Sequence, residues 1–297
     1  MTDLLEPFYK TTRVPIKLDH WSEHQDKLFR KCPLAWYRNA VLKLKPKVKK
    51  EYFSKGTAYH DALETFYTLP PEERSMKLML DKFEESVRAA ATEDAKIGNL
   101  VDSAVLVFAA YWKKWGADEK IPQAETEVSG EVEIPNTGGV KYVYRVDLLV
   151  REPQPFILDF KTGDKLDAED LIAHDLQLPR YIWALVNSGL PVSTAIYQCI
   201  KTVSSGRGKI ELARRPITPS RREISWAVHD LAMVVNEVQR EDRLIYHNYG
   251  FGCRFCDYHD ICLVAKSGGD PEAITQENYT QGGSESGDSN IIEGQDS

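Results

Sequence analysis

The sequence predicts a mixed α/β fold, because it contains a pair of strands with helical stretches on both sides. Residues 140–150 and 156–162 are rich in β-branched and aromatic side chains, and the Pro-containing segment 151–155 separates them. This is the pattern of a β-hairpin. Apolar residues recur at helical spacing before the hairpin, in residues 54–67, and after it, in residues 220–238. Strands and helices therefore follow one another along a single chain, as in a mixed α/β protein.

The remaining elements follow from the same kinds of pattern. The pair Pro70–Pro71 ends the helix that precedes it, and a capping box at Ser220–Glu223 opens the last long helix. Strict alternation of polar and apolar residues over 125–134 indicates a half-exposed strand. Taken together, helices are expected at residues 28–37, 54–67, 72–91, 99–115, 176–185 and 220–238, and strands at residues 125–134, 140–150, 156–162, 194–202 and 209–216.

The predicted hairpin carries charged side chains in a pattern typical of a metal site. Alternation along a strand places Arg145 and Asp147 on one face of the first arm, and Asp159 and Lys161 on one face of the second. Phe160 points the other way, towards a core. Two carboxylates and an ammonium are costly to bury without a partner, and a divalent cation offsets that cost. Carboxylate oxygens suit Mg²⁺ or Mn²⁺, and a lysine beside the ion can hold or activate an attacking water.

A structural role for the same residues is an alternative interpretation. Asp147 and Lys161 could form a cross-strand ion pair on a solvated face, since such faces are common in antiparallel sheets. His60 lies one turn before Glu64 on the helix at 54–67 and shares a face with it. A lone helical histidine is more often a surface or core residue than a ligand. These patterns alone leave the choice open.

The distribution of charged residues along the chain indicates its domain organisation and the kinds of partner it could bind. Seven of the 45 acidic residues lie after Lys266, where there is no Lys or Arg, so the other 38 acidic residues balance the 38 basic ones. The net charge of −7 therefore belongs to the tail and does not argue against a polyanionic partner. We expect one domain over residues 1–266 and a disordered acidic tail over residues 267–297.

Cellular location and redox state follow from the apolar runs and the cysteines. No apolar run approaches the length of a membrane span, and the N-terminus has no charged-then-apolar leader. We therefore expect a cytoplasmic protein without a membrane partner. The five cysteines fit metal ligation with one spare thiol, Cys199, better than a disulfide framework.

Three of the cysteines form the sharpest short motif in the chain. Cys253, Cys256 and Cys262 follow a glycine at spacings typical of thiolate ligation. A fourth ligand must come from elsewhere, and Cys32 is one candidate. A zinc site with His259 as the fourth ligand is a second reading. Three unconnected core cysteines are a third.

Six motifs in order resemble a known nuclease family. They are Cys32-Pro33, Gly56-Thr57-Ala58-Tyr59-His60, Asp147, Asp159-Phe160-Lys161-Thr162-Gly163, Gln177-Leu178-Pro179-Arg180-Tyr181, and Cys253 with Cys256 and Cys262. Each is weak alone, but together they resemble the RecB-like branch of the PD-(D/E)XK nuclease superfamily from about Phe29 to Cys262. More narrowly, the chain resembles its iron-sulfur exonucleases, which include CRISPR-associated exonucleases and the nuclease domain of AddB.

The resemblance implies a fold and a role for each matching residue. The implied fold is a restriction-endonuclease-like central mixed sheet flanked by helices. The implied ligands of Mg²⁺ or Mn²⁺ are His60, Asp147, Asp159 and the Phe160 carbonyl. Lys161 would position the attacking water, and Gln177 and Tyr181 would order the site and the substrate. A [4Fe-4S] cluster would be held by Cys32, Cys253, Cys256 and Cys262, and would join the N- and C-terminal segments. Tyr144 departs from the family pattern, which usually has glycine three positions before the hairpin aspartate.

The expected function is metal-dependent hydrolysis of DNA phosphodiesters by an exonuclease that favours single strands or ends. The resemblance places such enzymes in recombination, repair, phage DNA metabolism or CRISPR spacer acquisition. Because the chain has no Gly-x-x-x-x-Gly-Lys-Ser/Thr loop, any helicase partner must be another chain. The alternative is a catalytically inactive nucleic-acid-binding or assembly subunit with a structural iron-sulfur or zinc site.

Overall fold

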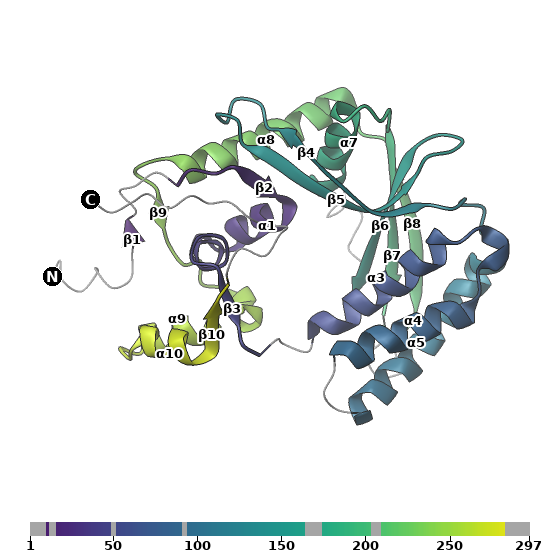
Figure 1. Ribbon diagram of the computed structural model, residues 1–297, viewed down its shortest axis with the longest axis horizontal. Helices are drawn as coiled ribbons and strands as arrows, with labels where there is room; N and C mark the ends of the chain where they lie inside the picture. Colours follow the sequence, from purple (N-terminus) through teal and green to yellow (C-terminus); the bar gives the residue numbers. More distant parts are fainter. Residues whose placement is uncertain are drawn as a thin grey trace. The chain divides into compact units, whose positions relative to one another are not determined.

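The computed structural model describes residues 10–11, 16–48, 52–90, 94–163, 174–202 and 209–282. The chain forms two compact units, and we call them the terminal unit and the central unit. The terminal unit is Met1–Lys50, Glu131–Val143 and Val228–Ser297, and the central unit is Glu51–Gly130 and Tyr144–Ala227. Figure 1 shows the order of the elements along the chain. The single domain expected over residues 1–266 thus has two compact parts, each made of separate segments.

A mixed sheet forms the middle of the fold, as the resemblance implied. Strands β5 (Lys141–Val150) and β6 (Phe156–Gly163) are the predicted hairpin, paired antiparallel with Leu148 opposite Leu158. Strand β7 (Thr194–Lys201) runs parallel to β6 over all eight residues of each. Strand β8 (Glu211–Ile217) is antiparallel to β7, and β4 (Glu125–Glu133) pairs with β5. A parallel neighbour on one side and an antiparallel one on the other make β6 an interior strand.

Helices flank the sheet of the central unit. Helix α3 (Tyr52–Thr68) packs against α4 (Met76–Ala90), which packs against α5 (Asp94–Lys114), and Figure 1 shows the three side by side. Helix α7 (Gln177–Asn187) contacts β7. One apolar cluster joins α3, α4 and α5 to the sheet, and it includes Leu63, Phe66, Phe83, Phe108, Leu158 and Phe160. Burial of each such side chain contributes about 1.5–3 kcal/mol, so this cluster holds α3 in place.

A largely buried ion pair joins β8 to the segment that follows α5. Arg214 of β8 pairs with Glu119, and the Tyr67 hydroxyl donates to Glu119 Oε2 at 2.7 Å. Gln198 of β7 accepts from Arg214 Nε at 2.7 Å and donates to the Tyr111 hydroxyl at 2.7 Å. Burial alone would raise the pKa of Glu119, but the hydrogen bond and charge of Arg214 hold it below the usual value. Each buried polar group here has a partner, as stable cores require.

In the terminal unit, a proline divides the helix predicted at 28–37. Helix α1 (Glu23–Lys31) ends at Cys32, whose extended backbone precedes α2 (Pro33–Trp36) and the π-helical turn Tyr37–Val41. A residue before proline is pushed out of the helical region, which explains the break. Strand β2 (His20–Ser22) runs parallel to the first residues of β5. The capping box at Ser220 is formed, and it opens α8 (Arg221–Gln239), which enters this unit at Val228.

The tail predicted to be disordered from residue 267 is in part folded. Helix α9 (His259–Lys266) is followed by α10 (Pro271–Asn278) and by β10 (Tyr279–Gln281), which pairs with β3 (Leu44–Pro46). Asp270 caps α10, accepting from the backbone of Glu272 at 2.8 Å. The disorder prediction is therefore wrong for these residues, and the rest of that tail, residues 283–297, lies outside the described ranges. The remaining short elements are β1 (Lys10–Thr11), β9 (Leu244–Ile245) and the 3₁₀ turns Pro71–Glu73, Gly116–Asp118 and Phe251–Phe255.

The helices of the described ranges are too short or too polar to cross a membrane.

Candidate active site

Three side chains of the central unit form a candidate metal site. His60 and Glu64 lie one turn apart on α3, and Asp147 comes from β5. Each offers a ligand atom, and these three atoms lie within 4.8 Å of one another. His60 Nδ1 is 3.7 Å from Asp147 Oδ2. Within the described ranges, this is the one group of three or more His, Cys, Asp or Glu residues with atoms so close.

Phe160 of β6 connects two of these three residues through its backbone. Its N–H donates to Asp147 Oδ2 at 2.8 Å. Its backbone also hydrogen-bonds the His60 ring in a contact that raises the pKa of His60, as a carbonyl acceptor does. The Phe160 side chain is buried, with its ring centroid 5.6 Å from that of His60 in an edge-to-face arrangement. The core residue Phe160 therefore sets the positions of His60 and Asp147.

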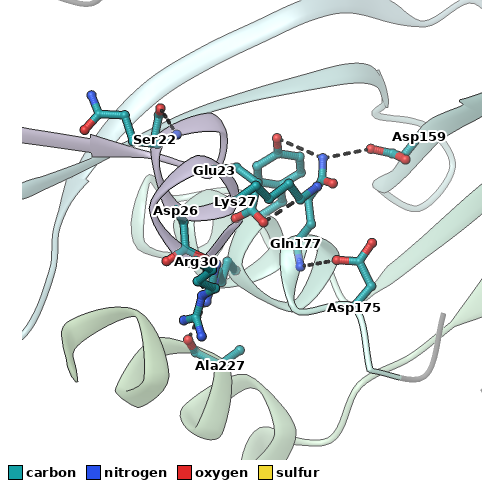
Figure 2. Close-up of polar contacts among 12 residues, drawn as sticks. Ser22, Glu23, Asp26, Lys27, Arg30, Asp159, Asp175, Gln177 and Ala227 are labelled. Carbon is teal, nitrogen blue, oxygen red and sulfur yellow. Dashed lines mark hydrogen bonds and ion pairs between the residues drawn. The ribbon is translucent and has the colours of Figure 1, made fainter. Parts of the chain in front are cut away.

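A second group of polar residues extends from the neighbouring part of β6. Lys161 Nζ lies 2.7 Å from Asp159 Oδ2 and donates to Gln177 Oε1 at 3.0 Å. The Gln177 amide nitrogen donates to Asp159 Oδ1 at 3.2 Å and to the Tyr181 hydroxyl at 3.1 Å. Figure 2 shows the Gln177 side chain directed from α7 towards Asp159. These four residues form one connected network whose members hold each other in fixed orientations.

Gln177 is itself fixed at the start of α7. Its backbone N–H donates to Asp175 Oδ1 at 2.9 Å, as Figure 2 also shows. Such a contact satisfies one of the free N–H groups at a helix N-terminus. The first turn of α7 is buried on the sheet, so the amide group of Gln177 has little freedom to turn away from β6.

Burial and neighbouring charges determine the protonation states of the site. Burial lowers the pKa of His60 below its usual value, which leaves a neutral imidazole at pH 7. Burial, then the charges of Asp147 and Asp61, raise the pKa of Glu64 to about 7. Burial likewise raises the pKa of Asp159 to about 6, although Lys161 opposes this.

Lys161 remains an ammonium despite its burial. Burial alone would lower the pKa of Lys161, but the charge of Asp159 and the hydrogen bond to it keep the pKa above the usual value. Lys161 can therefore donate hydrogen bonds and stabilise negative charge. It does not act as a base in this state.

The donor set fits a hard divalent cation. One neutral imidazole and two carboxylates are ligands that Mg²⁺ and Mn²⁺ accept. Burial raises the pKa of Glu64, and the charges of Asp147 and Asp61 raise it further, so both desolvation and like charge disfavour its ionised form. A cation bound by the oxygens of Glu64 and Asp147 would offset the repulsion between these two carboxylates.

A comparison with protein families identifies the superfamily of the chain. The model of the PD-(D/E)XK nuclease superfamily matches residues 20–263. The chain belongs to the PD-(D/E)XK nuclease superfamily. No curated protein matches this nuclease.

Two solved structures are similar to the nuclease at low identity. One is a protein from Eubacterium rectale provisionally described as an exonuclease, with 14% identity, a TM-score of 0.49, and coverage of 82% of this chain and 87% of that one. The other is SSO0001, with 19% identity, a TM-score of 0.35, and coverage of 71% and 95%. Membership in the superfamily rests on the match to the family model.

The nuclease brings the predicted site residues together on the central unit, with one difference in grouping. His60 and Asp147 lie in the metal group, while Asp159 lies outside it and contacts Lys161 and Gln177 through its two oxygens. The role of Asp159 as a ligand stays a prediction. The alternative of an Asp147–Lys161 pair on a solvated face is not what the structure shows, because Lys161 pairs with Asp159, which is only 2% exposed.

Glu64 was not predicted as a ligand, although the sequence carried a signal for it. The one-turn spacing from His60 places both residues on one face of α3. That face becomes a ligand face only because β5 brings Asp147 to it. Sequence spacing on a single helix cannot show which strand the helix will meet.

Tyr144, the departure from the family pattern, is directed into the fold. Its side chain is buried, and its hydroxyl donates to Ser188 Oγ at 3.0 Å. It fills space left by Gly130, where an added Cβ would lie 2.5 Å from the Tyr144 hydroxyl oxygen. The substitution therefore changes the packing beside β4 and removes no ligand.

The structure does not support the predicted [4Fe-4S] cluster. Among the described residues, neither the four cysteines Cys32, Cys253, Cys256 and Cys262 nor the zinc set with His259 forms a close ligand group. The sulfur atoms contact protein groups instead. Arg38 donates to Cys262 Sγ at 2.9 Å, and Cys32 and Cys253 both contact the Asn248 backbone, at 3.5 and 3.8 Å.

Cys256 is partly buried near two of the other cysteines. Burial raises the pKa of the Cys256 thiol, and the neighbouring Cys32 and Cys262 raise it further. The fifth cysteine, Cys199, is buried in β7, as expected of a structural residue.

Replacing Glu64 by glutamine is expected to stabilise the cation-free nuclease at pH 8. The folded pKa of about 7 exceeds the usual 4.5, so the folded state holds this proton more tightly than the unfolded chain. The contribution of Glu64 to the free energy of unfolding is therefore fully present below about pH 4.5 and is lost as the pH rises through 7. Since the group is half-buried, the gain in free energy of unfolding should be about 1 kcal/mol.

Thermal unfolding in EDTA at pH 8 and at pH 5 measures this difference. The gain of Glu64→Gln should be present at pH 8 and much smaller at pH 5. Glu133→Gln, an exposed glutamate at the end of β4, is the control and should show no such dependence. A variant that melts below the wild type at pH 8 would show that Glu64 is already paired in the folded state.

Proposed function

We propose that this nuclease is a Mg²⁺- or Mn²⁺-dependent DNA exonuclease that acts on single strands or ends. The observation that carries the proposal is the arrangement of two groups along β6. His60, Glu64 and Asp147 form the metal group, and Lys161 is held beside it by Asp159 and Gln177. Membership in the superfamily supplies the DNA substrate and the hydrolytic reaction.

The residues of the metal group have a common role. His60, Glu64 and Asp147 would hold the cation, with Asp159 and the Phe160 carbonyl as the further ligands that were predicted. A bound divalent cation supplies Lewis-acid chemistry, since it polarises a phosphoryl oxygen and makes water more acidic. The neutral state of His60 leaves its ring nitrogen free to act as a donor atom to the metal rather than as a competing positive charge.

Lys161 supplies the positive charge that the transition state needs. Hydrolysis of a phosphodiester places additional negative charge on the phosphoryl oxygens as water attacks in line. The Lys161 ammonium can orient the water and stabilise that charge, because it is preorganised by Asp159 and Gln177. Tyr181 fixes the amide of Gln177 and so acts through Lys161. Recognition of the backbone carries no base sequence information, so cleavage should show little sequence preference.

Digestion of DNA labelled separately at each end tests the proposal. Single-stranded and double-stranded substrates are incubated with Mn²⁺, with Mg²⁺ and with EDTA. We expect release of short labelled products from one end of the single strand with either cation and none in EDTA. Internal fragments without an end preference would contradict exonuclease action. No cleavage with any cation would favour the alternative of an inactive binding subunit.

The pathway in which the nuclease acts stays a prediction. Recombination, repair, phage DNA metabolism and CRISPR spacer acquisition were expected from the resemblance, as was a helicase or another protein partner. None of these follows from the geometry of the site.

A further inference from the structure

The segment around the cysteine motif carries an exposed surface of aromatic and basic side chains. Tyr249, Phe251 and Phe255 are between 45% and 80% exposed. The rings of Phe251 and Phe255 lie 5.7 Å apart, inclined at 64°. Four cations lie among or beside these rings, and we call the whole set the aromatic–basic surface: Tyr249, Phe251, Phe255, Lys31, Arg38, Arg254 and Lys266. All of these residues belong to the terminal unit.

Each cation of this surface is placed by a described contact. Lys266 Nζ lies 5.7 Å from the centre of the Tyr249 ring, and the Arg254 guanidinium lies 5.9 Å from that of Phe255. Burial, and then the charge of Arg38, lower the pKa of His247, whose ring is 4.2 Å from that of Tyr249. A cation near the face of an aromatic ring is attracted to it, and this attraction stabilises the orientation of both side chains.

Gly252 lets the fourth cation approach this segment. An added Cβ at Gly252 would lie 3.0 Å from Lys31 Cε, closer than ordinary van der Waals contact. The absence of a side chain at Gly252 therefore allows the Lys31 stem to lie along the turn between Phe251 and Cys253. Lys31 is further tied to this region because its carbonyl accepts from the Asn248 side chain at 3.2 Å.

The positive charges of this surface are not neutralised by nearby acids. Over the described ranges, no carboxylate pairs with Lys31, Arg38, Arg254 or Lys266, and the segment 243–256 contains no Asp or Glu. Asp257 directly follows this segment and pairs with none of the four cations in the described ranges, and the next acidic residues along the chain have other partners. Asp242 pairs with Arg240, and Asp260 accepts from the side chain of Asn278. Among the described residues, this surface therefore carries four basic side chains that form no ion pair with a carboxylate.

We propose that the aromatic–basic surface binds single-stranded nucleic acid, by stacking unpaired bases on Tyr249, Phe251 and Phe255 while the four cations contact phosphates. Exposed rings bind bases only when the bases are unpaired, because a duplex keeps its base faces stacked inside. Unneutralised cations between the rings match the phosphates that alternate with bases along a strand. An apolar protein partner would not need them. This inference rests on the proposed function, since it assigns the nuclease a substrate contact outside the metal group.

Binding of a fluorescein-labelled oligothymidylate to the full chain, followed by anisotropy in EDTA, tests the proposal. Without a divalent cation the measurement does not depend on turnover, so it separates this surface from the nuclease activity. We expect the double variant Phe251→Ala/Phe255→Ala to weaken binding about tenfold or more. Arg254→Gln with Lys266→Gln should reduce the dependence of affinity on salt concentration.

A matched control and a duplex substrate complete the experiment. Trp226 of α8 is 68% exposed and lies in the central unit, so Trp226→Ala removes an exposed ring elsewhere and should leave the affinity unchanged. A blunt duplex should lose little affinity in the double variant, because it offers no free base faces. Oligothymidylate binding by the double variant within twofold of the wild type would overturn the proposal. Equal losses for strand and duplex would also overturn it, since they would show a general charge effect or a disturbed fold.

Discussion

Replacement of Lys161 by alanine is expected to lower the rate of DNA cleavage by roughly 10²–10³-fold while DNA binding is retained. Lys161 is kept as an ammonium by Asp159 and is held at 3.0 Å by Gln177. A donor fixed in this way stabilises charge that appears only in the transition state. Its loss should therefore lower kcat with little change in KM. Steady-state cleavage of end-labelled single strands with Mn²⁺ and binding in EDTA provide the two measurements.

Lys201 offers a closely matched control for Lys161. It lies on the neighbouring strand β7, its side chain is 26% exposed against 27% for Lys161, and it also pairs with a carboxylate, that of Glu211, at 2.8 Å. Lys201→Ala should leave kcat within about twofold of the wild type, since surface pairs contribute little. If the two alanine variants cleave DNA equally well, Lys161 has been assigned the wrong role.

Asp147→Asn is expected to remove cation binding and, with it, cleavage. Asparagine can still accept the Phe160 N–H through its amide oxygen, so the contact between β5 and β6 survives. The lost negative charge is the feature that a hard cation requires. Affinity for Mn²⁺ should fall by at least the 10–100-fold that loss of an outer partner typically costs. Calorimetric titration of the protein with Mn²⁺ measures this loss without any substrate.

Asp61 provides the matched control for Asp147. It follows His60 directly on α3, its charge also raises the pKa of Glu64, and it accepts from Ser86 Oγ at 2.6 Å outside the metal group. Asp61→Asn therefore removes the same charge from nearly the same place without removing a ligand. We expect its Mn²⁺ affinity to change less than about fivefold. Equal losses of Mn²⁺ affinity in the two variants would mean that the ion is held by the overall negative charge of this region and not by coordination to Asp147.

The arrangement of the hairpin was predictable because its information is local. The period of two in residues 140–162 determines which side chains share a face, and the segment with Pro153 fixes where the strand turns. The capping box at Ser220 and the break at Cys32-Pro33 follow from chemistry within a few residues. Each of these features could be predicted without knowledge of the fold.

The metal group and the grouping of Asp159 required contacts between distant segments. Glu64 and Asp147 are far apart in the sequence, and only the packing of α3 on the sheet brings them together. Asp159 was expected beside the cation because it shares a hairpin with Asp147. In the structure it contacts Lys161 and Gln177 instead, because the start of α7 brings Gln177 to this part of β6.

The cysteines and the tail show two different errors of sequence reasoning. Ligand-like spacing at Cys253, Cys256 and Cys262 constrains only the order of residues, whereas the positions of the sulfur atoms depend on the turns between them. The acidic composition after residue 267 concealed an ordinary helix start, Asp270-Pro271, and the aromatic residue Tyr279, whose hydroxyl reaches Asp260. Average composition does not report on short elements that dock through one or two side chains.

The backbone of Phe160 makes the chemistry of this nuclease depend on its interior. The backbone of this one residue contacts both His60 and Asp147, while its ring lies in the apolar cluster with α3 and α4. A mutation deep in that cluster, remote from any ligand, can thus alter the spacing of the coordinating atoms without changing a single one of them. Selection for catalytic efficiency in such a protein therefore also acts on the residues of the apolar cluster, because a change of side-chain volume there changes the geometry of the active site.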